Sequence, residues 1–270
     1  MIRILSIFGG LFFALALLWS FGKGAYSAAT EPVPQSAEKA LHKHPKELEL
    51  ASNGPLGHFD RQQLQRGFAV YEQVCSNCHS LGYVSYRDLA ALGYDQDEVK
   101  AIAAKATVNA VDPLTGEAKD RPGTPSDKFP PVVYAGTGHP PDLSLITKAR
   151  HDGPAYVYSL LTGYAAQTPA MLAKHPEAKT GEGLYYNPYF ANLNIAMPPP
   201  LTSDGQVTYS DGTPATIDQM AKDVAAFLVW TAEPKLDKRH QTGLAVLGFL
   251  LFATILAYMA KRQVWGDLAH

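Results

Sequence analysis

Cysteine is almost absent from this chain of 270 residues, which contains only two. A framework of several disulfides is therefore excluded, because such a framework needs a larger, evenly numbered set of cysteines. Basic charge is also scarce, since 23 lysines and arginines stand against 25 acidic residues and the formal net charge is −2. Without a basic stripe to release counterions from phosphates, we expect no nucleic-acid binding. A mildly acidic surface suits a basic soluble protein partner instead.

The two cysteines stand in one motif, Cys75-Ser76-Asn77-Cys78-His79. This spacing is typical of covalent haem attachment, in which each thiol adds to one haem vinyl group and the histidine binds the iron. A dithiol redox centre, half of a zinc site and a structural disulfide are the alternatives. No thioredoxin-like βαβ pattern and no finger-like histidine pair accompany the motif, and a two-residue gap closes a strained ring. Attachment of one haem c is the favoured interpretation.

A methionine is the expected ligand at the sixth iron position. Met1 and Met259 lie in apolar end segments, which leaves three candidates. Met220 falls on the apolar face of a predicted helix and is expected in the core, whereas Met171 lies in a polar loop and stays an alternative. Met197 is favoured because three prolines follow it and stiffen the backbone that would hold its thioether on the iron.

Arg121 is a candidate partner for a haem propionate. It lies in a long predicted loop, and its guanidinium can match a carboxylate with two parallel hydrogen bonds. A solvated loop arginine is the alternative. Four histidines are expected at the surface or in loops, with a role as sixth iron ligand as their alternative: His58, His139, His151 and His175.

Long apolar stretches occur near both ends of the chain. Near the amino terminus, Arg3 precedes an apolar run that small residues follow, which predicts a signal peptide over residues 1–29. An uncleaved anchor is the alternative. The remaining domain, residues 30–238, is then exported to the periplasm, where c-type haem is attached.

The second apolar stretch, residues 243–260, carries no charge and covers ~27 Å as a helix. Basic residues stand on both sides of it, and Trp265 follows. We therefore predict a single transmembrane anchor over residues 239–262 and a cytoplasmic tail over residues 263–270. A buried core helix is the alternative, although the stretch is apolar on all sides.

The pattern of the exported domain is mainly α-helical with long loops. Apolar residues at helical spacing predict a helix over residues 61–73 that begins at Asp60 and leads directly into the haem motif. Residues 109–142 contain many prolines and glycines and are expected to be a loop. Further predicted helices lie at residues 95–106, at residues 154–164, and between a capping box at Thr216 and Gln219 and a stop at Pro234.

Several segments together resemble the cytochrome c1 family of bacterial type, the haem subunit of the cytochrome bc1 complex. Residues 66–80 (RGFAVYEQVCSNCHS) resemble that family's haem segment, and the resemblance extends over about residues 45–266. The other matching segments follow in the family's order: 140–146 (PPDLSLI), 149–153 (ARHDG), 158–164 (YSLLTGY), 183–190 (GLYYNPYF), 195–200 (IAMPPP) and 211–216 (DGTPAT).

The resemblance implies a ligand set of Cys75, Cys78, His79 and Met197, and it supports Arg121 near a propionate. One residue departs from the family pattern, because Lys128 stands where an aromatic side chain is expected near the propionates. Some bacterial members also carry an extra cysteine pair that braces the methionine segment, and this chain has none. Its prolines and packing must therefore hold the methionine.

The resemblance further implies an electron-transfer subunit of ubiquinol–cytochrome c reductase in a respiratory or photosynthetic chain, not an enzyme with catalytic residues of its own. Its haem would take electrons from a Rieske iron–sulfur protein and pass them to a soluble or anchored c-type cytochrome. Its anchor would pack against a cytochrome b subunit in the inner membrane. Two rival functions are an anchored cytochrome that feeds another reductase or oxidase, and an enzyme or sensor with an open haem.

Overall fold

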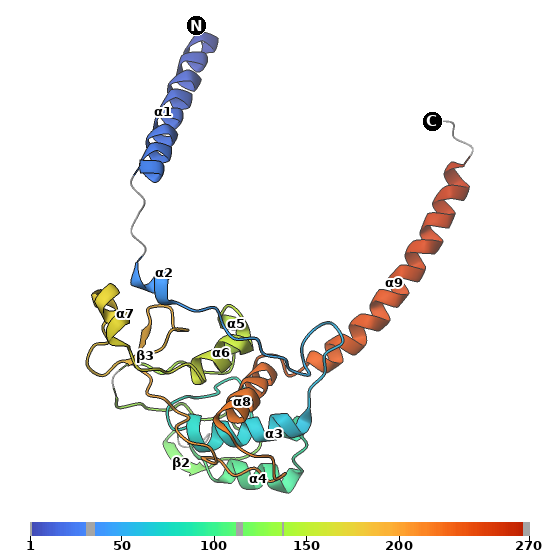
Figure 1. Ribbon diagram of the computed structural model, residues 1–270. Coiled ribbons are helices and arrows are strands. Elements are labelled where there is room, and N and C mark those ends of the chain that lie inside the picture. The colour runs from blue at the N-terminus through green and yellow to red at the C-terminus, as the bar shows by residue number, and fades with distance from the viewer. Residues whose placement is uncertain (1, 31–35, 112–115, 137, 267–270) are drawn as a thin grey trace. The chain divides into compact units, whose positions relative to one another are not determined.

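The computed structural model describes residues 2–30, 36–111, 116–136 and 138–266, in two units that meet between residues 41 and 42. The first unit contains two helices, α1 (Ile2–Thr30) and α2 (Ala37–Leu41). The second unit is mainly helical, as the sequence predicted (Figure 1). Its helices are α3 (Arg61–Val70), η1 (Tyr71–Cys75), η2 (Tyr86–Leu92), α4 (Gln96–Ala104), α5 (Ile146–Ala149), α6 (Gly153–Leu161), α7 (Pro169–Lys174), η3 (Pro176–Ala178), α8 (Ile217–Ala232) and α9 (Leu236–Trp265).

Helix α3 confirms the prediction of a helix that leads into the haem motif. The Asp60 carboxylate caps its start by accepting hydrogen bonds from the backbone N–H groups of Gln62 and Gln63. Leu64 and Phe68 are buried on one face, at the spacing of a helix that packs on a core. The helix continues without a break into the single π-helical turn η1, whose last residue is Cys75.

The core of the second unit lies where α3 crosses α8. Gly67 makes this crossing close, because a methyl group at that position would overlap the backbone carbonyl of Asp223. The aromatic ring of Phe227 packs against Phe68 and Trp230 at centroid distances of 5.7 Å in each case. The last soluble helix therefore packs directly on the helix that precedes the haem motif.

A buried ionic cluster reinforces the α3–α8 crossing. The Asp223 carboxylate is fully buried and accepts hydrogen bonds from the Arg66 guanidinium, with Nε at 2.9 Å, and from Gln219 Nε2 at 2.9 Å. Arg66 also pairs with Asp211 at 2.7 Å, in the loop that precedes α8. Thr216 caps α8 as predicted, but Gln219, the expected second half of the capping box, donates to Asp223 instead.

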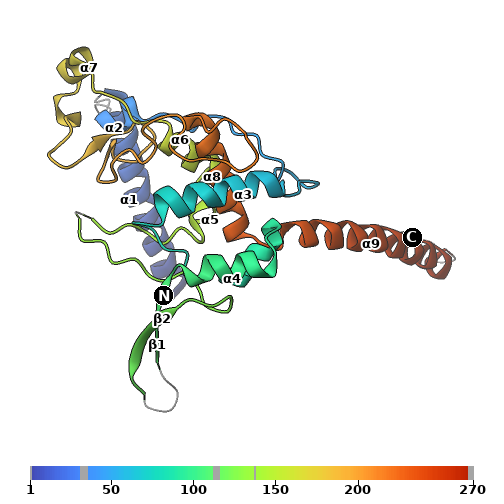
Figure 2. The same ribbon diagram turned by 90° about the horizontal axis from the view of Figure 1, so that it is seen from below.

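The expectation that residues 109–142 lack regular structure is wrong in part. Strands β1 (Thr107–Val111) and β2 (Ala118–Pro122) form an antiparallel hairpin, with Val108 opposite Arg121, that projects from the unit (Figure 2). Alternate residues of β1 are half-buried at most, so no hydrophobic face marked this strand in the sequence. A second short antiparallel pair joins β3 (Tyr185–Tyr186) to β4 (Asn194–Ile195), with Tyr185 opposite Ile195.

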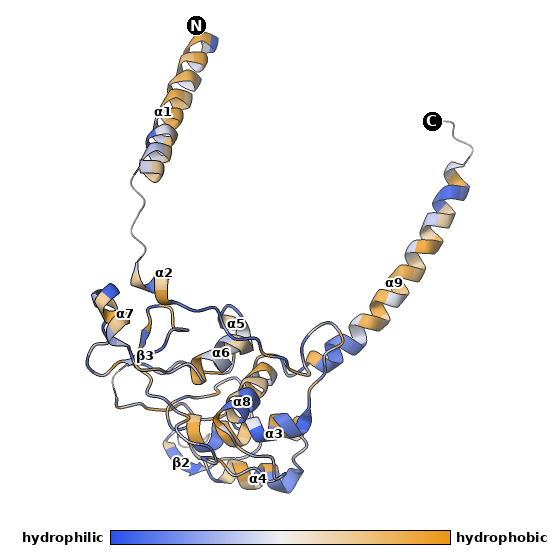
Figure 3. Ribbon diagram, in the orientation of Figure 1, coloured by the Kyte–Doolittle hydropathy of each residue, from blue (hydrophilic) through white to orange (hydrophobic). Residues whose placement is uncertain are grey.

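Two described helices, α1 and α9, are long and apolar enough to cross a membrane. Helix α9 contains the predicted anchor, residues 239–262, and extends three residues beyond each end of it. Hydrophobic residues occupy the middle of α9 and hydrophilic residues its two ends (Figure 3). Half of the expected cytoplasmic tail, residues 267–270, lies outside the described residues.

Candidate haem-binding site

The haem motif forms a single tight turn at the end of η1. The backbone N–H groups of Cys78 and His79 both donate to the carbonyl oxygen of Cys75, at 3.1 Å and 2.9 Å. Both cysteines are free thiols, so the strained disulfide is not formed. Burial, with the neighbouring Cys78, raises the pKa of the Cys75 thiol to about 12. The Cys75 thiol therefore stays protonated, and the turn presents two cysteine side chains and one imidazole from five consecutive residues.

The orientation of the His79 ring is fixed by a backbone carbonyl. Its Nδ1 lies 2.7 Å from the carbonyl oxygen of Pro141. A carbonyl oxygen can only accept, so Nδ1 carries the proton and Nε2 keeps a lone pair for a metal. Burial lowers the pKa of His79, which favours the neutral ring. This arrangement matches the usual support of metal-binding histidines, whose second nitrogen is held by a carbonyl or carboxylate.

Asp142 fastens the segment that follows His79 to the loop that holds the imidazole. Its carboxylate accepts hydrogen bonds from Ser80 Oγ at 2.8 Å and from the backbone N–H groups of Gly82 at 2.6 Å and Ser144 at 2.8 Å. Partial burial acts to raise the pKa of Asp142, but these hydrogen bonds outweigh it and the pKa is lowered. The Asp142 carboxylate therefore holds residues 80–82 beside the loop that contacts the His79 ring.

A buried phenol supports the same side from within the core. The Tyr71 hydroxyl donates to the backbone carbonyl of His79 at 2.9 Å. Burial raises the pKa of Tyr71, so the phenol stays protonated and remains a donor. The Tyr71 ring packs against Phe129 and Phe227, at centroid distances of 5.9 Å and 5.8 Å. The backbone of His79, the predicted iron ligand, is thus tied to the α3–α8 core.

Met197 lies in a proline-rich segment that follows β4. The Tyr164 hydroxyl donates to its backbone carbonyl at 3.0 Å, and burial raises the pKa of that phenol. The preceding residue, Ala196, lies near Gly138, where an added methyl group would be 3.7 Å from the Ala196 Cβ. Because Gly138 belongs to the loop that reaches Pro141, the fold brings the methionine segment beside the loop that orients His79.

The other methionine candidates occupy different places. Met220 is fully buried in the core on α8, as its helical position predicted. Met171 is half-buried on the short helix α7, in a segment expected to be a loop. Its backbone N–H bonds to Thr168, which caps that helix. Neither position weakens the preference for Met197.

Arg121 lies on β2 and forms a bidentate ion pair within its own loop. Its Nη1 and Nη2 atoms lie 2.7 Å and 2.8 Å from the two carboxylate oxygens of Asp127. This pair and the donors of Thr124 lower the pKa of Asp127. Lys128, the departure from the family pattern, places its ammonium 5.8 Å from the centroid of the exposed Tyr83 ring. The role of Arg121 toward a propionate remains a prediction.

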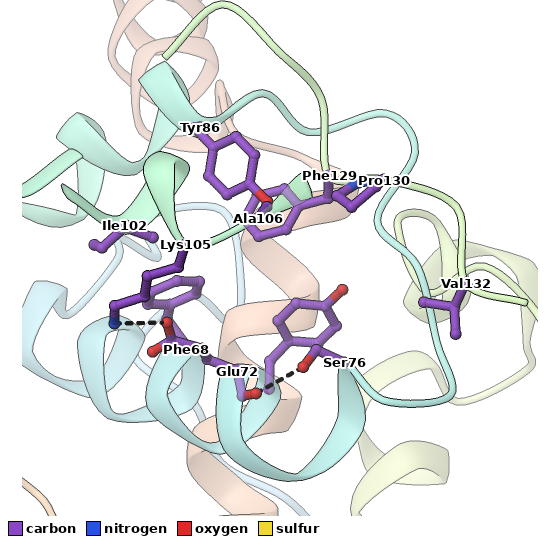
Figure 4. Close-up of a pocket in the computed structure, with 11 residues that line it drawn as sticks. Phe68, Glu72, Ser76, Tyr86, Ile102, Lys105, Ala106, Phe129, Pro130 and Val132 are labelled. Atoms are coloured by element: carbon purple, nitrogen blue, oxygen red, sulfur yellow. Dashed lines mark hydrogen bonds and ion pairs between the residues drawn. The ribbon is translucent and has the colours of Figure 1, made fainter. Parts of the chain in front are cut away.

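A pocket of about 210 Å³ lies beside the haem motif (Figure 4). Aromatic rings from α3, η1, η2 and the loop after β2 line it, together with a Glu72–Lys105 ion pair of 3.2 Å. Ser76 is the one motif residue in its lining. None of the four predicted haem ligands lines this pocket among the described residues, so we do not identify it as the iron site.

The chemistry of the donor set fits a covalently attached haem. The turn supplies two thiols, His79 supplies an unprotonated Nε2, and Met197 sits on a braced segment near the same loop. No cluster of three or more His, Cys, Asp or Glu side chains suited to a metal ion occurs in the described part of the chain. The zinc alternative therefore gains no support.

Sequence reasoning missed the groups that hold the ligands in place. The Pro141 carbonyl is a backbone atom and leaves no residue-specific signal. Asp142, Tyr71 and Tyr164 all fall in segments that carry the family resemblance, and that was the available hint of their roles. Their individual hydrogen bonds depend on contacts between distant parts of the chain.

Comparisons with known proteins agree with this geometry. The sequence model of the Cytochrome C1 family matches residues 50–268. The chain is 43% identical over 248 residues to cytochrome c1 of Rhodospirillum rubrum, covering 86% of this chain and 89% of that protein. It is 42% identical over 264 residues to a mitochondrial cytochrome c1 haem protein of Arabidopsis thaliana, covering 94% and 82%.

A third relative has a different length. The chain is 44% identical over 237 residues to a protein of Bradyrhizobium diazoefficiens named cytochrome b/c1. That match covers 79% of this chain but 34% of the longer protein. The shared region therefore corresponds to about a third of the relative.

Proposed function

Because this chain belongs to the cytochrome c1 family, we propose that it carries electrons from a Rieske iron–sulfur protein to a c-type cytochrome. Family membership makes it a haem-carrying electron-transfer subunit of the cytochrome bc1 complex, and not an enzyme on its own. The finer proposal concerns its two electron partners, its ligands and its placement. For the ligands, the observation that carries the proposal is the hydrogen bond from His79 Nδ1 to the Pro141 carbonyl.

In this proposal Cys75 and Cys78 would hold one haem c covalently through their thiols, and His79 and Met197 would bind its iron. When bound, the haem supplies an iron that gains and loses a single electron. The protein's own contribution is to hold both ligands still. Pro141 fixes the ring of His79, and Tyr164 fixes the backbone of Met197. Fixed ligands keep the surrounding dipoles in place while charge changes, so little reorganisation accompanies each transfer.

The proposed placement follows from the two apolar helices. Residues 1–29 direct export as a signal peptide, and residues 30–238 form the haem domain on the periplasmic side of the inner membrane. Residues 239–262 span that membrane, and residues 263–270 end in the cytoplasm. The family supports a position beside cytochrome b, and the relative named cytochrome b/c1 carries both names in one chain.

Optical spectra of the purified, haem-loaded protein test the ligand assignment. Met197→Leu removes the thioether, so we expect the methionine-to-iron band in the far red to disappear and the reduced protein to bind carbon monoxide. The reduction potential should also fall, because thioether ligation raises it. Loss of the band in this variant would support an electron carrier with a closed iron.

Met171→Leu is the matched control, since Met171 is the alternative ligand and lies on a short, exposed helix. It should leave the band, the potential and the lack of carbon monoxide binding unchanged. An unchanged spectrum in Met197→Leu would refute the assignment. Co-purification of a b-type haem tests the proposed complex separately, and its absence would favour the rival anchored cytochrome.

A further inference from the structure

A small loop of the haem domain, residues 51–58, lies against the first turns of α9 (Figure 1). Two hydrogen bonds tie this region to the helix. The backbone N–H of Phe59 donates to Asp237 Oδ1 at 3.0 Å, and His240 Nδ1 donates to the Gly57 carbonyl at 2.7 Å. The loop therefore has a fixed position on the helix that forms the candidate membrane span.

The loop is compact and presents an apolar tip. The backbone N–H of His58 bonds to the Ala51 carbonyl at 2.9 Å, and that of Gly57 bonds to the Gly54 carbonyl at 3.2 Å. Gly54 has a φ of +78°, a backbone conformation that favours glycine and completes the turn. Pro55 and Leu56 follow it and are exposed, with 70% of Leu56 accessible. An exposed leucine alone means little, but this one has a defined position.

That position corresponds to the depth of the lipid headgroups. His240, which holds the loop, precedes the first residue of the uncharged stretch, Gly243, by three positions, or ~4.5 Å of helix rise. The headgroup layer is roughly 5–8 Å thick on each side of the hydrocarbon core. With the uncharged stretch in the core, the backbone of the loop lies within the headgroup layer.

The two ends of α9 are also anchored differently. At its carboxyl end, Tyr258 and Trp265 supply the amphipathic rings that usually sit at a membrane surface. From Leu236 to Gly248, at the end nearer the haem domain, the helix contains no aromatic residue. The helix therefore brings no tyrosine or tryptophan ring of its own to this surface, and the exposed tip at Pro55 and Leu56 lies beside the helix there.

We propose that Pro55 and Leu56 insert into the lipid interface as a second membrane contact of the haem domain. The occupant of this surface is lipid, because the loop is bonded to the spanning helix at headgroup depth. Together with α9, this contact gives the domain two points of attachment. Two points restrict the tilt and rotation of the domain relative to the membrane plane, which a single helix would not do.

Electron paramagnetic resonance of a spin label at position 56 tests the proposal. Leu56→Cys is introduced into the full chain, and the haem-loaded complex is labelled with a nitroxide in lipid nanodiscs. Oxygen concentrates in lipid and a nickel chelate stays in water, so we expect the label to be several-fold more accessible to oxygen than to the chelate. Lys100→Cys on α4 is the matched exposed control, and it should show the opposite preference.

Two results would overturn the proposal, and one control tests the haem attachment separately. A label at position 56 that behaves like the label at position 100 would place the loop in water. Protection from both reagents would place a protein surface, such as cytochrome b, over the tip. The wild-type chain should take up no label, because haem attachment consumes Cys75 and Cys78. Labelling of the wild-type chain would contradict the proposed haem attachment. The loop proposal would still be decided by the difference between the labels at positions 56 and 100.

Discussion

The two sides of the candidate iron site are held in different ways. On the histidine side, Pro141 orients the ring of His79, Tyr71 binds its carbonyl, and Asp142 closes the following loop. On the methionine side, one hydrogen bond within the described residues, from Tyr164, reaches the backbone of Met197. The histidine side is part of the α3–α8 core, whereas the methionine side rests on prolines and one phenol.

This difference indicates which ligand is the more easily lost. The His79 backbone is coupled to buried helices, so displacement of the histidine requires unfolding of the core. The Met197 segment can move by losing one hydrogen bond, worth roughly 1 kcal/mol net. We therefore expect the methionine to leave the iron before the domain unfolds, and the variants below separate the two sides.

The largest expected effect on stability comes from the buried ionic cluster at the α3–α8 crossing. Asp223→Ala leaves the partly buried Arg66 guanidinium without its main partner. Removal of one member of a buried pair costs about 3–5 kcal/mol, so the free energy of unfolding measured with urea should fall by that amount. Asp97→Ala, which breaks an exposed pair with Lys100, is the control and should change stability by about 0.5 kcal/mol or less. Equal effects of the two variants would contradict the structure.

A pair of tyrosine variants compares the two sides directly. Tyr71→Phe leaves the part-buried His79 carbonyl without this donor and should cost about 1–3 kcal/mol of stability. Tyr164→Phe should cost less but should release the methionine earlier. In guanidinium, its far-red band should disappear at a lower concentration than the helical circular dichroism. For Tyr71→Phe both signals should shift together, and coincident transitions in Tyr164→Phe would refute the proposed difference.

The hydrogen bonds of the Asp142 carboxylate should make the stability of the domain depend on pH. The pKa of Asp142 is lower in the folded chain than in the unfolded chain, so its stabilisation is present above the unfolded pKa, near 3.9. It is lost as the pH falls through the folded pKa. Asp142→Ala should therefore lower stability by about 1 kcal/mol at pH 7, and the gap to the wild type should shrink below about pH 4. A gap that is constant with pH would exclude this carboxylate as its source.

The smallest expected effect tests the predicted propionate role of Arg121. A nearby positive charge disfavours the oxidised haem, so Arg121→Gln should lower the reduction potential by roughly 30 mV, about a threefold change in the one-electron equilibrium. Asp127→Asn, which leaves the guanidinium without its paired charge, should raise the potential. Lys119→Gln on the same strand is the control and should have little effect. No shift in either of the first two variants would leave Arg121 as a structural residue of its loop.

The sequence predicted the elements whose pattern is local. The cap at Asp60, the helix that enters the motif and the amphipathic α8 follow from capping residues and apolar spacing, and the structure contains all three. The β1–β2 hairpin was missed because its residues are mostly exposed, so no alternation of apolar and polar residues marked it. The segment around Met171 was expected to be a loop, yet Thr168 and Pro169 begin a short helix there.

By itself, the sequence determined the haem motif, the apolar helix at each end and the family to which the chain belongs, because each is a pattern of neighbouring residues. Tertiary structure alone decided which ring nitrogen of His79 keeps a free lone pair, because the Pro141 carbonyl that binds the other nitrogen is 62 residues away. It also decided the contact of the 51–58 loop with α9, across 183 residues. Residue spacing cannot encode such contacts, since they depend on how the whole chain packs.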